Sequence, residues 1–129
     1  MTIKQSISIK TSAAKVYAAL TSADQFGEFT GAVAEISTEE GGAFLTFGGQ
    51  ISGRNIELIP NQRIVQAWRV VNMWAEGVDS VVRFDISESG DTTTIDLTHT
   101  DYPDDAAEHL EPGWHKMYWE PLKAYLESD

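Results

Sequence analysis

His99 is the histidine whose residue type and setting are suited to acid–base chemistry near neutral pH. It shares the parity of Ile95 and Leu97 on a predicted strand, so its imidazole is expected on the core-facing side of the sheet. With Asp101 and Tyr118 it makes a candidate catalytic set around a cavity. A structural histidine, hydrogen-bonded at the end of its strand, explains the same pattern, and no assured catalytic partner accompanies it.

An acidic cluster follows this histidine in the sequence. Asp101, Asp104, Asp105 and Glu108 offer carboxylate oxygens, which are the ligands that divalent cations prefer. Their spacing does not match a calcium-binding loop, and acidic residues near the start of a helix are stabilised by the helix dipole. The sequence also lacks a nucleophile elbow, a phosphate-binding glycine loop and an HExxH motif. We therefore expect no metal site and no cofactor.

A second group of polar candidates lies in the middle of the chain. Arg54, Asn55 and Arg69 fall on adjoining predicted strands, and the guanidinium group can orient the carboxylate of a ligand or a protein partner. Alternatively, these two arginines, with Arg63 and Arg83, form cross-strand ion pairs, each worth about 0.2 to 1 kcal/mol. The expected acidic partners are Glu57, Asp85 and Asp96. The remaining histidines, His109 and His115, flank the start of the last predicted helix and are expected at the surface.

Length and charge limit the classes of protein to consider. The chain has 129 residues, which predicts one domain over 1–129, and its 42% hydrophobic and 22% charged residues are typical of globular proteins. No apolar run reaches the ~18 residues of a membrane span, and the N-terminus does not resemble a secretory signal. A net charge of −11 without a basic patch predicts no nucleic-acid binding. The absence of cysteine fits a cytoplasmic protein.

The elements that position these residues begin with a strand. Hydrophobic alternation predicts this strand over residues 2 to 10, and two short helices follow, capped by Ser12 and Ser22. After Gly31 the pattern predicts an antiparallel meander, with a turn at Pro60–Asn61.

A change of apolar parity interrupts the strand that contains Gly53. Ile51 has odd parity and Ile56 even parity, and one extra residue in a strand re-aims every later side chain. We therefore predict a β-bulge at Gly53.

The C-terminal part of the chain predicts two more strands and a long helix. SVVRFDIS and TTTIDLTHT pair, and after a short turn up to Leu110 the helix opens at Pro112, a good first-turn residue. Pro121 should bend the helix by clashing with the carbonyl group of Met117. The resulting fold class is α+β, with a curved antiparallel sheet of about six to seven strands wrapped around the helix.

A hollow is expected between the helix and the concave face of such a sheet. Aromatic residues are first of all core and cavity wall, and four tryptophans also suit a pocket or an interface anchor. The aromatic candidates are Trp68, Trp74, Phe84, Trp114, Tyr118 and Trp119. The predicted ligand-binding residues are Trp68, Phe84, Ile86, Ile95, Leu97, His99, Leu110, Trp114, Met117 and Tyr118.

The stretches GGQISGRNIELIPNQRIVQAWR and EPGWHKMYWEPLKAYL, together with Trp74, resemble the activator of heat-shock protein 90 ATPase homologue family. This family lies within the START-like (SRPBCC) helix-grip superfamily. The resemblance covers nearly the whole chain. Its motifs are specific in combination: the glycine–arginine–asparagine run at 53–55, the Trp68–Arg69 pair and Gly113–Trp114.

The resemblance implies a helix-grip fold with a central cavity, and for eukaryotic members a co-chaperone role. Those members carry an additional N-terminal domain that makes much of the chaperone contact, whereas Met1 here starts on the first strand, which puts stimulation of a chaperone ATPase in doubt. The leading hypothesis is a non-enzymatic member that binds an apolar small molecule, a protein partner, or both. The alternatives are a small cyclase or hydrolase using His99, Asp101 and Tyr118, and a chaperone cofactor of the stress response that acts through its surface.

Overall fold

A seven-stranded antiparallel sheet forms one layer of the structure and helices form the other. The computed structural model describes residues 2–71, 73–74 and 77–127. The strands are β1 (Thr2–Ile9), β2 (Glu35–Ile36), β3 (Ala43–Thr46), β4 (Ile51–Ile59), β5 (Arg63–Val70), β6 (Ser80–Ser89) and β7 (Thr92–Thr100). Their order across the sheet is β1-β7-β6-β5-β4-β3-β2, and every neighbouring pair is antiparallel.

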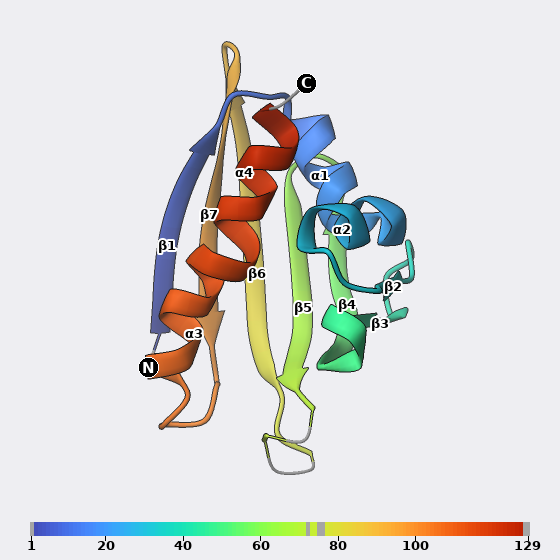
Figure 1. The fold of residues 1–129 in the computed structure, drawn as a ribbon, viewed down its shortest axis with the longest axis vertical. Coiled ribbons are helices and arrows are strands. Elements are labelled where there is room, and N and C mark those ends of the chain that lie inside the picture. The colour runs from blue at the N-terminus through green and yellow to red at the C-terminus, as the bar shows by residue number, and fades with distance from the viewer. Residues whose placement is uncertain (1, 72, 75–76, 128–129) are drawn as a thin grey trace.

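The helical layer consists of two short helices and one long C-terminal helix. The short helices are α1 (Ala13–Thr21) and α2 (Ala23–Thr30), and a 3-10 turn, η1 (Phe47–Gly49), precedes β4. The long helix is continuous and consists of α3 (Ala107–Gly113), a π-helical segment η2 (Trp114–Trp119) and α4 (Glu120–Glu127). Figure 1 shows it lying across the sheet, with α1 and α2 beside α4. The predicted α+β helix-grip fold is confirmed.

Local sequence signals account for the short helices and the central hairpin. The hydroxyl groups of Ser12 and Ser22 each accept a hydrogen bond from the backbone N–H three residues on, at 3.2 and 3.3 Å, so both predicted caps are confirmed. Asn61 has a φ of 64° in the turn after Pro60, a backbone conformation that asparagine adopts more readily than most residues. The turn between β4 and β5 lies where the sequence predicts it.

The predicted bulge at Gly53 is wrong. Gly53 pairs regularly with Phe44 on β3 and with Trp68 on β5, and the register shift in β4 comes after Asn55. The parity of the inward-facing residues in β4 therefore does change, but the change occurs after Asn55 and the glycine does not mark its position. Glycine occupies this position for another reason, because a Cβ there would overlap the Ala67 carbonyl oxygen and lie 2.6 Å from the Phe44 ring.

The C-terminal helix begins at Ala107, so the prediction that Pro112 opens it is also wrong. Pro112 lies inside α3, and the backbone then widens into η2, where the Glu120 N–H bonds to the carbonyl group of His115 five residues earlier. The bend expected at Pro121 stays a prediction.

The buried face of this helix packs against the sheet. Leu110, Trp114, Tyr118 and Leu122 are buried, as their helical spacing predicts. The buried sheet residues that belong to the same core are Val82, Phe84, Ile86, Ile95 and Leu97. In the part of the chain that the structure describes, no helix is long and apolar enough to cross a membrane.

Candidate functional site

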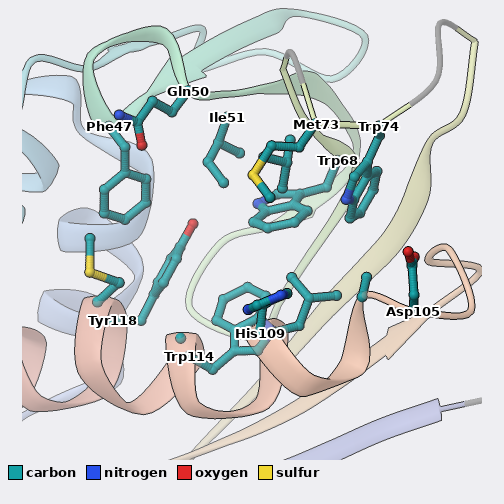
Figure 2. A pocket seen from close by; sticks show the side chains of 15 residues that line it. Phe47, Gln50, Ile51, Trp68, Met73, Trp74, Asp105, His109, Trp114 and Tyr118 are labelled. Carbon is teal, nitrogen blue, oxygen red and sulfur yellow. The ribbon is translucent and has the colours of Figure 1, made fainter.

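An open pocket lies between the C-terminal helix and the strands β4 and β5 (Figure 2). Its volume is about 400 Å³, which falls within the range of about 300 to 1,000 Å³ found for ligand sites. The residues that line it are Phe47, Gln50, Ile51, Trp68, Val70, Met73, Trp74, Asp105, Ala106, His109, Leu110, Gly113, Trp114, Met117 and Tyr118.

The inner wall of the pocket is aromatic and buried, whereas its rim is exposed and mixed. Trp68 and Trp114 stack with ring centroids 5.6 Å apart, and the Trp114 and Tyr118 centroids are 4.4 Å apart. Phe47 packs against Tyr118, with ring centroids 5.4 Å apart. The exposed residues of the rim are Gln50, Met73, Asp105, His109 and Met117. The pocket therefore suits a ligand that is apolar inside and polar at its outer end.

An indole N–H and a phenol hydroxyl are the polar groups of the inner wall. Trp68 is 3% exposed, and its Nε1 has no hydrogen-bond partner among the described residues. Burial raises the pKa of the Tyr118 hydroxyl far above its ordinary value, and the nearby Trp68 N–H only partly opposes this, so the phenol stays neutral. Figure 2 shows the Trp68 nitrogen and the Tyr118 oxygen facing the same part of the pocket.

His99 lies against Trp68 and Trp114 in a directed chain of hydrogen bonds. Its Nδ1 accepts a hydrogen bond from Trp114 Nε1 at 3.2 Å, and its Nε2 lies 2.8 Å from Ser80 Oγ. The Ser80 hydroxyl in turn donates to the Trp68 carbonyl oxygen at 2.7 Å. An indole nitrogen can only donate, so Nδ1 carries no proton and Nε2 carries the proton of a neutral imidazole. Burial favours the same state and lowers the pKa of His99 to about 4.

The structure does not bring the candidate catalytic set together. His99 is bonded to Ser80 and Trp114, and Asp101 is exposed just after the end of β7. Tyr118 directs its hydroxyl into the pocket. His99 thus has the environment of the structural alternative, a histidine hydrogen-bonded near the end of its strand.

Half of the predicted ligand-binding residues line the pocket and half do not. Trp68, Leu110, Trp114, Met117 and Tyr118 line it. The residues that lie in the packed core outside it are Phe84, Ile86, Ile95, Leu97 and His99. The reason is that the helix sits directly on β6 and β7, where Phe84 contacts both Trp114 and Trp119 at centroid distances of 5.8 and 6.2 Å. The open volume therefore remains on the side of β4 and β5.

Several lining residues were not predicted as ligand contacts. They are Phe47, Gln50, Ile51, Val70, Met73, Trp74, Asp105, Ala106, His109 and Gly113. Phe47 has a φ of 53°, which is unusual for an aromatic residue and turns the chain at η1. The two glycines after it, Gly48 and Gly49, both have positive φ and are the sequence signal for this irregular turn. His109 is exposed, as expected, yet it stands at the rim of the pocket.

Arg54, Asn55 and Arg69, the polar candidates of the central strands, do not share one site. Asn55 is 1% exposed and donates to the Ser37 carbonyl oxygen at 2.8 Å, which ties β4 to the segment before β3. Arg69 donates to the Trp74 carbonyl oxygen at 3.2 Å, and Arg54 is exposed. None of these three lines the pocket.

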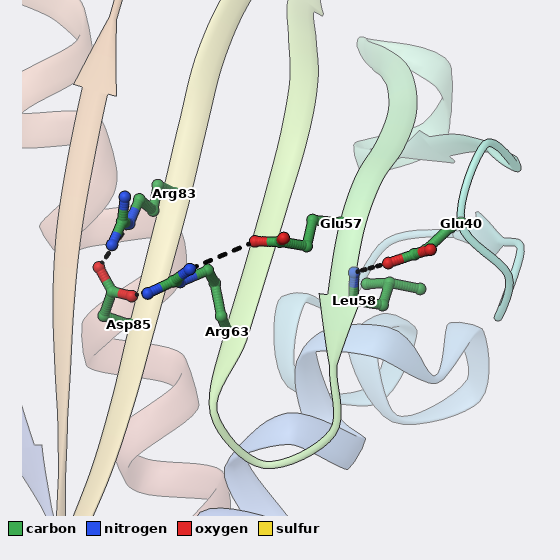
Figure 3. Close-up of polar contacts among 6 residues, drawn as sticks. All are labelled: Glu40, Glu57, Leu58, Arg63, Arg83 and Asp85. Carbon is green, nitrogen blue, oxygen red and sulfur yellow. Dashed lines mark hydrogen bonds and ion pairs between the residues drawn. The ribbon is translucent and has the colours of Figure 1, made fainter.

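The cross-strand ion pairs in this sheet are made by Arg63, and Arg83 forms a further ion pair with Asp85 within β6 (Figure 3). Asp85 accepts hydrogen bonds from Arg63 at 2.9 Å and from Arg83 at 2.7 Å, and Arg63 also lies 3.4 Å from Glu57. All of these side chains are partly exposed, so each pair contributes at most about 1 kcal/mol.

The acidic cluster that follows β7 lies at the protein surface. Within residues 2–71, 73–74 and 77–127, no group of three or more His, Cys, Asp or Glu side chains is placed to hold a metal ion. Asp101, Asp104, Asp105 and Glu108 are all exposed.

Comparison with known proteins identifies the family of this chain. The family model described as Activator of Hsp90 ATPase homolog 1-like protein matches residues 10–127. The chain belongs to this family. An activator of 90 kDa heat shock protein ATPase homolog from Dictyostelium discoideum is 32% identical over 123 residues, which are 95% of this chain and 32% of that protein. The chain spans about a third of the length of the curated relatives it matches.

Solved structures share the fold of this family member. An Hsp90 activator from Plasmodium falciparum superposes with a TM-score of 0.91 at 24% identity, covering 98% of this chain and 96% of that one. The Aha1 dimer from Colwellia psychrerythraea gives a TM-score of 0.84 at 24% identity, with coverage of 98% and 96%. At these identities the likeness concerns the fold.

The residues that carry the family resemblance have identifiable structural tasks. Gly53 makes room for the Phe44 ring, and Asn55 holds the segment before β3. Trp68 and Trp114 form the stacked inner wall of the pocket, and Trp114 also fixes the tautomer of His99. Two of the family motifs therefore contribute to the pocket wall, and the glycine–arginine–asparagine run serves the packing of the sheet.

Proposed function

We propose that this family member binds a small, largely apolar ligand that carries a hydrogen-bond acceptor, in the pocket between the C-terminal helix and β4–β5. The observation that supports this most strongly is the buried Nε1–H of Trp68, which makes no well-formed hydrogen bond among the described residues and faces the pocket beside the Tyr118 hydroxyl, with which it interacts only weakly. A buried donor without an acceptor costs about 1 to 3 kcal/mol. An acceptor oxygen on a ligand would recover part of this cost.

The rest of the pocket wall supports the same ligand class. Phe47, Ile51, Trp114 and Leu110 offer apolar surface around the donor. The neutral Tyr118 hydroxyl can donate to the same oxygen or accept from a second polar group. A ketone, ester or amide on an aromatic or alicyclic body fits this pattern.

The test is a cycle that changes the ligand and the protein separately. The affinity of 2-acetylnaphthalene is compared with that of 2-ethylnaphthalene, which has nearly the same shape but no acceptor, by calorimetric titration. Wild type should favour the ketone by about 0.5 to 1.5 kcal/mol, the usual net worth of a hydrogen bond. Trp68→Phe should lose this preference while still binding the hydrocarbon.

A matched control variant separates the donor from general effects of losing a tryptophan. Trp119→Phe also removes a buried indole N–H, but that group donates to Gln5 and lies outside the pocket, so the preference for the ketone should persist. The proposal fails if neither compound binds the folded protein. It also fails if Trp68→Phe keeps the full preference for the ketone.

Contact with an Hsp90-type chaperone is the second candidate function. It is favoured by the curated relatives, which are named as activators of the 90 kDa heat shock protein ATPase, and by the exposed Met73 and Met117 at the pocket rim. This role would make the protein a cytoplasmic cofactor of the stress response. Titration of purified Hsp90, with ATPase activity measured in parallel, separates binding from stimulation.

An enzymatic role through His99 has no such support. Both ring nitrogens are engaged within the protein, and the imidazole does not line the pocket. A cyclase or hydrolase would need an acid or a base that reaches the ligand.

A further inference from the structure

The mouth of the pocket continues into a second depression on the same face of the molecule. This depression has a volume of about 450 Å³ and lies around the start of the β5–β6 connection and the segment between β7 and α3. Met73, Trp74 and Asp105 line both spaces, so the two spaces adjoin each other at these residues. A ligand that fills the inner pocket and projects outward therefore meets this second surface.

The second surface has charges of one sign. Asp101, Asp104 and Asp105 line it, and all three are exposed. No lysine or arginine is among the described residues that line either space, and the basic side chain at the mouth is His109. The net charge of −11 adds a long-range field of the same sign. An anionic group in this position would be repelled and a cationic group attracted.

Aromatic faces next to these carboxylates favour the same sign of charge. Trp74 lines both spaces and packs edge-on against Trp68, with centroids 5.8 Å apart. The face of an indole ring attracts a cation, and the effect is stronger where water is partly excluded. Tyr102, which is buried, adds a further aromatic surface to the depression.

We propose that the ligand of this domain is a cationic amphiphile, whose apolar body places an acceptor oxygen near Trp68 and whose positive charge lies at the mouth beside Asp105 and Trp74. The proposal rests on the binding function proposed above, and it adds the sign of the ligand's charge and the position at which the charged group binds. Two independent observations carry it. The inner one is the buried Trp68 N–H, which faces the pocket without a well-formed hydrogen bond, and the outer one is the adjoining depression lined by Asp101, Asp104 and Asp105.

Acidic residues before a helix have a structural explanation as well, because the positive end of the helix dipole stabilises them. This explanation concerns the stability of the fold and not the choice of ligand. Binding affinity and free energy of unfolding must therefore be measured on the same variants. If the aspartates have a purely structural role, their replacement changes only the free energy of unfolding.

The experiment uses three compounds built on one 6-acetyl-2-naphthyl scaffold. The 2-oxygen carries a methyl group, a 2-(trimethylammonio)ethyl group or a carboxymethyl group, which makes the compound neutral, permanently cationic or anionic. At low ionic strength the cation should bind about tenfold more tightly than the neutral compound, and the anion more weakly than either, as expected for a charge a few ångströms from a carboxylate near the protein surface. High salt should reduce this spread while the neutral compound is little affected.

The variants assign the effect to the mouth. Asp105→Asn should reduce the preference for the cation to about threefold, and Asp104→Asn with Asp105→Asn should nearly abolish it, since each removes one nearby charge. Asp91→Asn is the matched control, because Asp91 is an exposed carboxylate in the β6–β7 turn and should leave the preference unchanged. Figure 1 shows this turn at the opposite end of the sheet from the β5–β6 connection, whose residues line the depression.

The outcomes distinguish the two proposals. Equal binding of all three compounds, or a preference that survives the double variant, overturns the assignment of a cationic ligand while the binding function stands. Failure of all three compounds to bind overturns the binding function itself.

Discussion

Lowering the pH from 7 to 5 should destabilise this fold through His99. The pKa of His99 is lowered by burial from 6.5 to about 4, so the unfolded chain binds more protons than the folded chain between these values. The free energy of unfolding therefore falls as the pH falls below about 6.5, and this effect levels off below about pH 4. Linkage gives a loss of about 2 kcal/mol by pH 5 and about 3 kcal/mol by pH 4.

The hydrogen bonds explain why the folded protein resists this protonation. A proton on Nδ1 would face the Trp114 N–H, so two donors would meet in a buried space. His99→Gln should remove the titration while its amide oxygen and amide N–H take over the roles of Nδ1 and Nε2. His115→Gln, at an exposed histidine, is the matched control.

The assay is urea unfolding followed by tryptophan fluorescence between pH 4.5 and 7.5. The 20 acidic residues also titrate toward the lower end of this range, but their contributions cancel when each variant is subtracted from wild type. The stability of wild type relative to His99→Gln should fall by about 2 kcal/mol from pH 7 to pH 5. The same subtraction is made for His115→Gln as the comparison.

A wild-type minus His99→Gln difference that does not change with pH would refute the reasoning, because it would mean that His99 titrates alike in the folded and unfolded chains. Nitrogen NMR offers an independent check on the tautomer. The His99 ring should show a protonated Nε2 and an unprotonated Nδ1 at pH 6.

Two further predictions concern the sheet and the helix, and both are measured by chemical denaturation. Gly53→Ala should lower the free energy of unfolding by about 1 to 3 kcal/mol or more, because the new methyl group overpacks against a carbonyl oxygen and a ring. Gly113→Ala should instead raise it by about 0.5 to 1 kcal/mol, because this glycine lies inside a helix and its Cβ would meet nothing within 4 Å. Equal effects at the two glycines would contradict this. Asp85→Asn should cost about 1 kcal/mol at low salt and less at high salt. Burial tends to raise the pKa of Asp85, but hydrogen bonds from Arg83 and Arg63 outweigh it and lower the pKa, so this contribution is present above about pH 4 and lost as the pH falls further.

The fold could be predicted from the sequence because its signals are local. Alternation of apolar residues defines each strand, and serines at positions 12 and 22 start the two short helices by accepting backbone hydrogen bonds. The turn at Pro60–Asn61 depends only on residues within it. Such signals act over a few residues, so they survive in a single sequence.

The position of the pocket could not be predicted in the same way. Period and parity show that Phe84 and Leu97 face inward, but they do not show which strands the helix covers. Whether an inward residue lines a cavity depends on contacts between elements far apart in the chain, such as Trp114 with Phe84. All five predicted lining residues on β6 and β7, Phe84 and Leu97 among them, are therefore buried outside the pocket, whereas Ile51 and Val70 line it.

The π-helical segment supplies the geometry that regular helical spacing misses. In an α-helix, residues 114 and 119 point about 140° apart, so a stripe of period 3.6 that includes Trp114 excludes Trp119. Across η2 the two indole rings stack with centroids 5.7 Å apart, and both are buried. Trp119 donates to Gln5 on β1 at 2.7 Å, while Trp114 donates to His99 and forms the pocket wall. The wider turn thus lets one helix place two tryptophans against β1, β7 and β6, and the open pocket remains beside β4 and β5, where the ligand is proposed to bind.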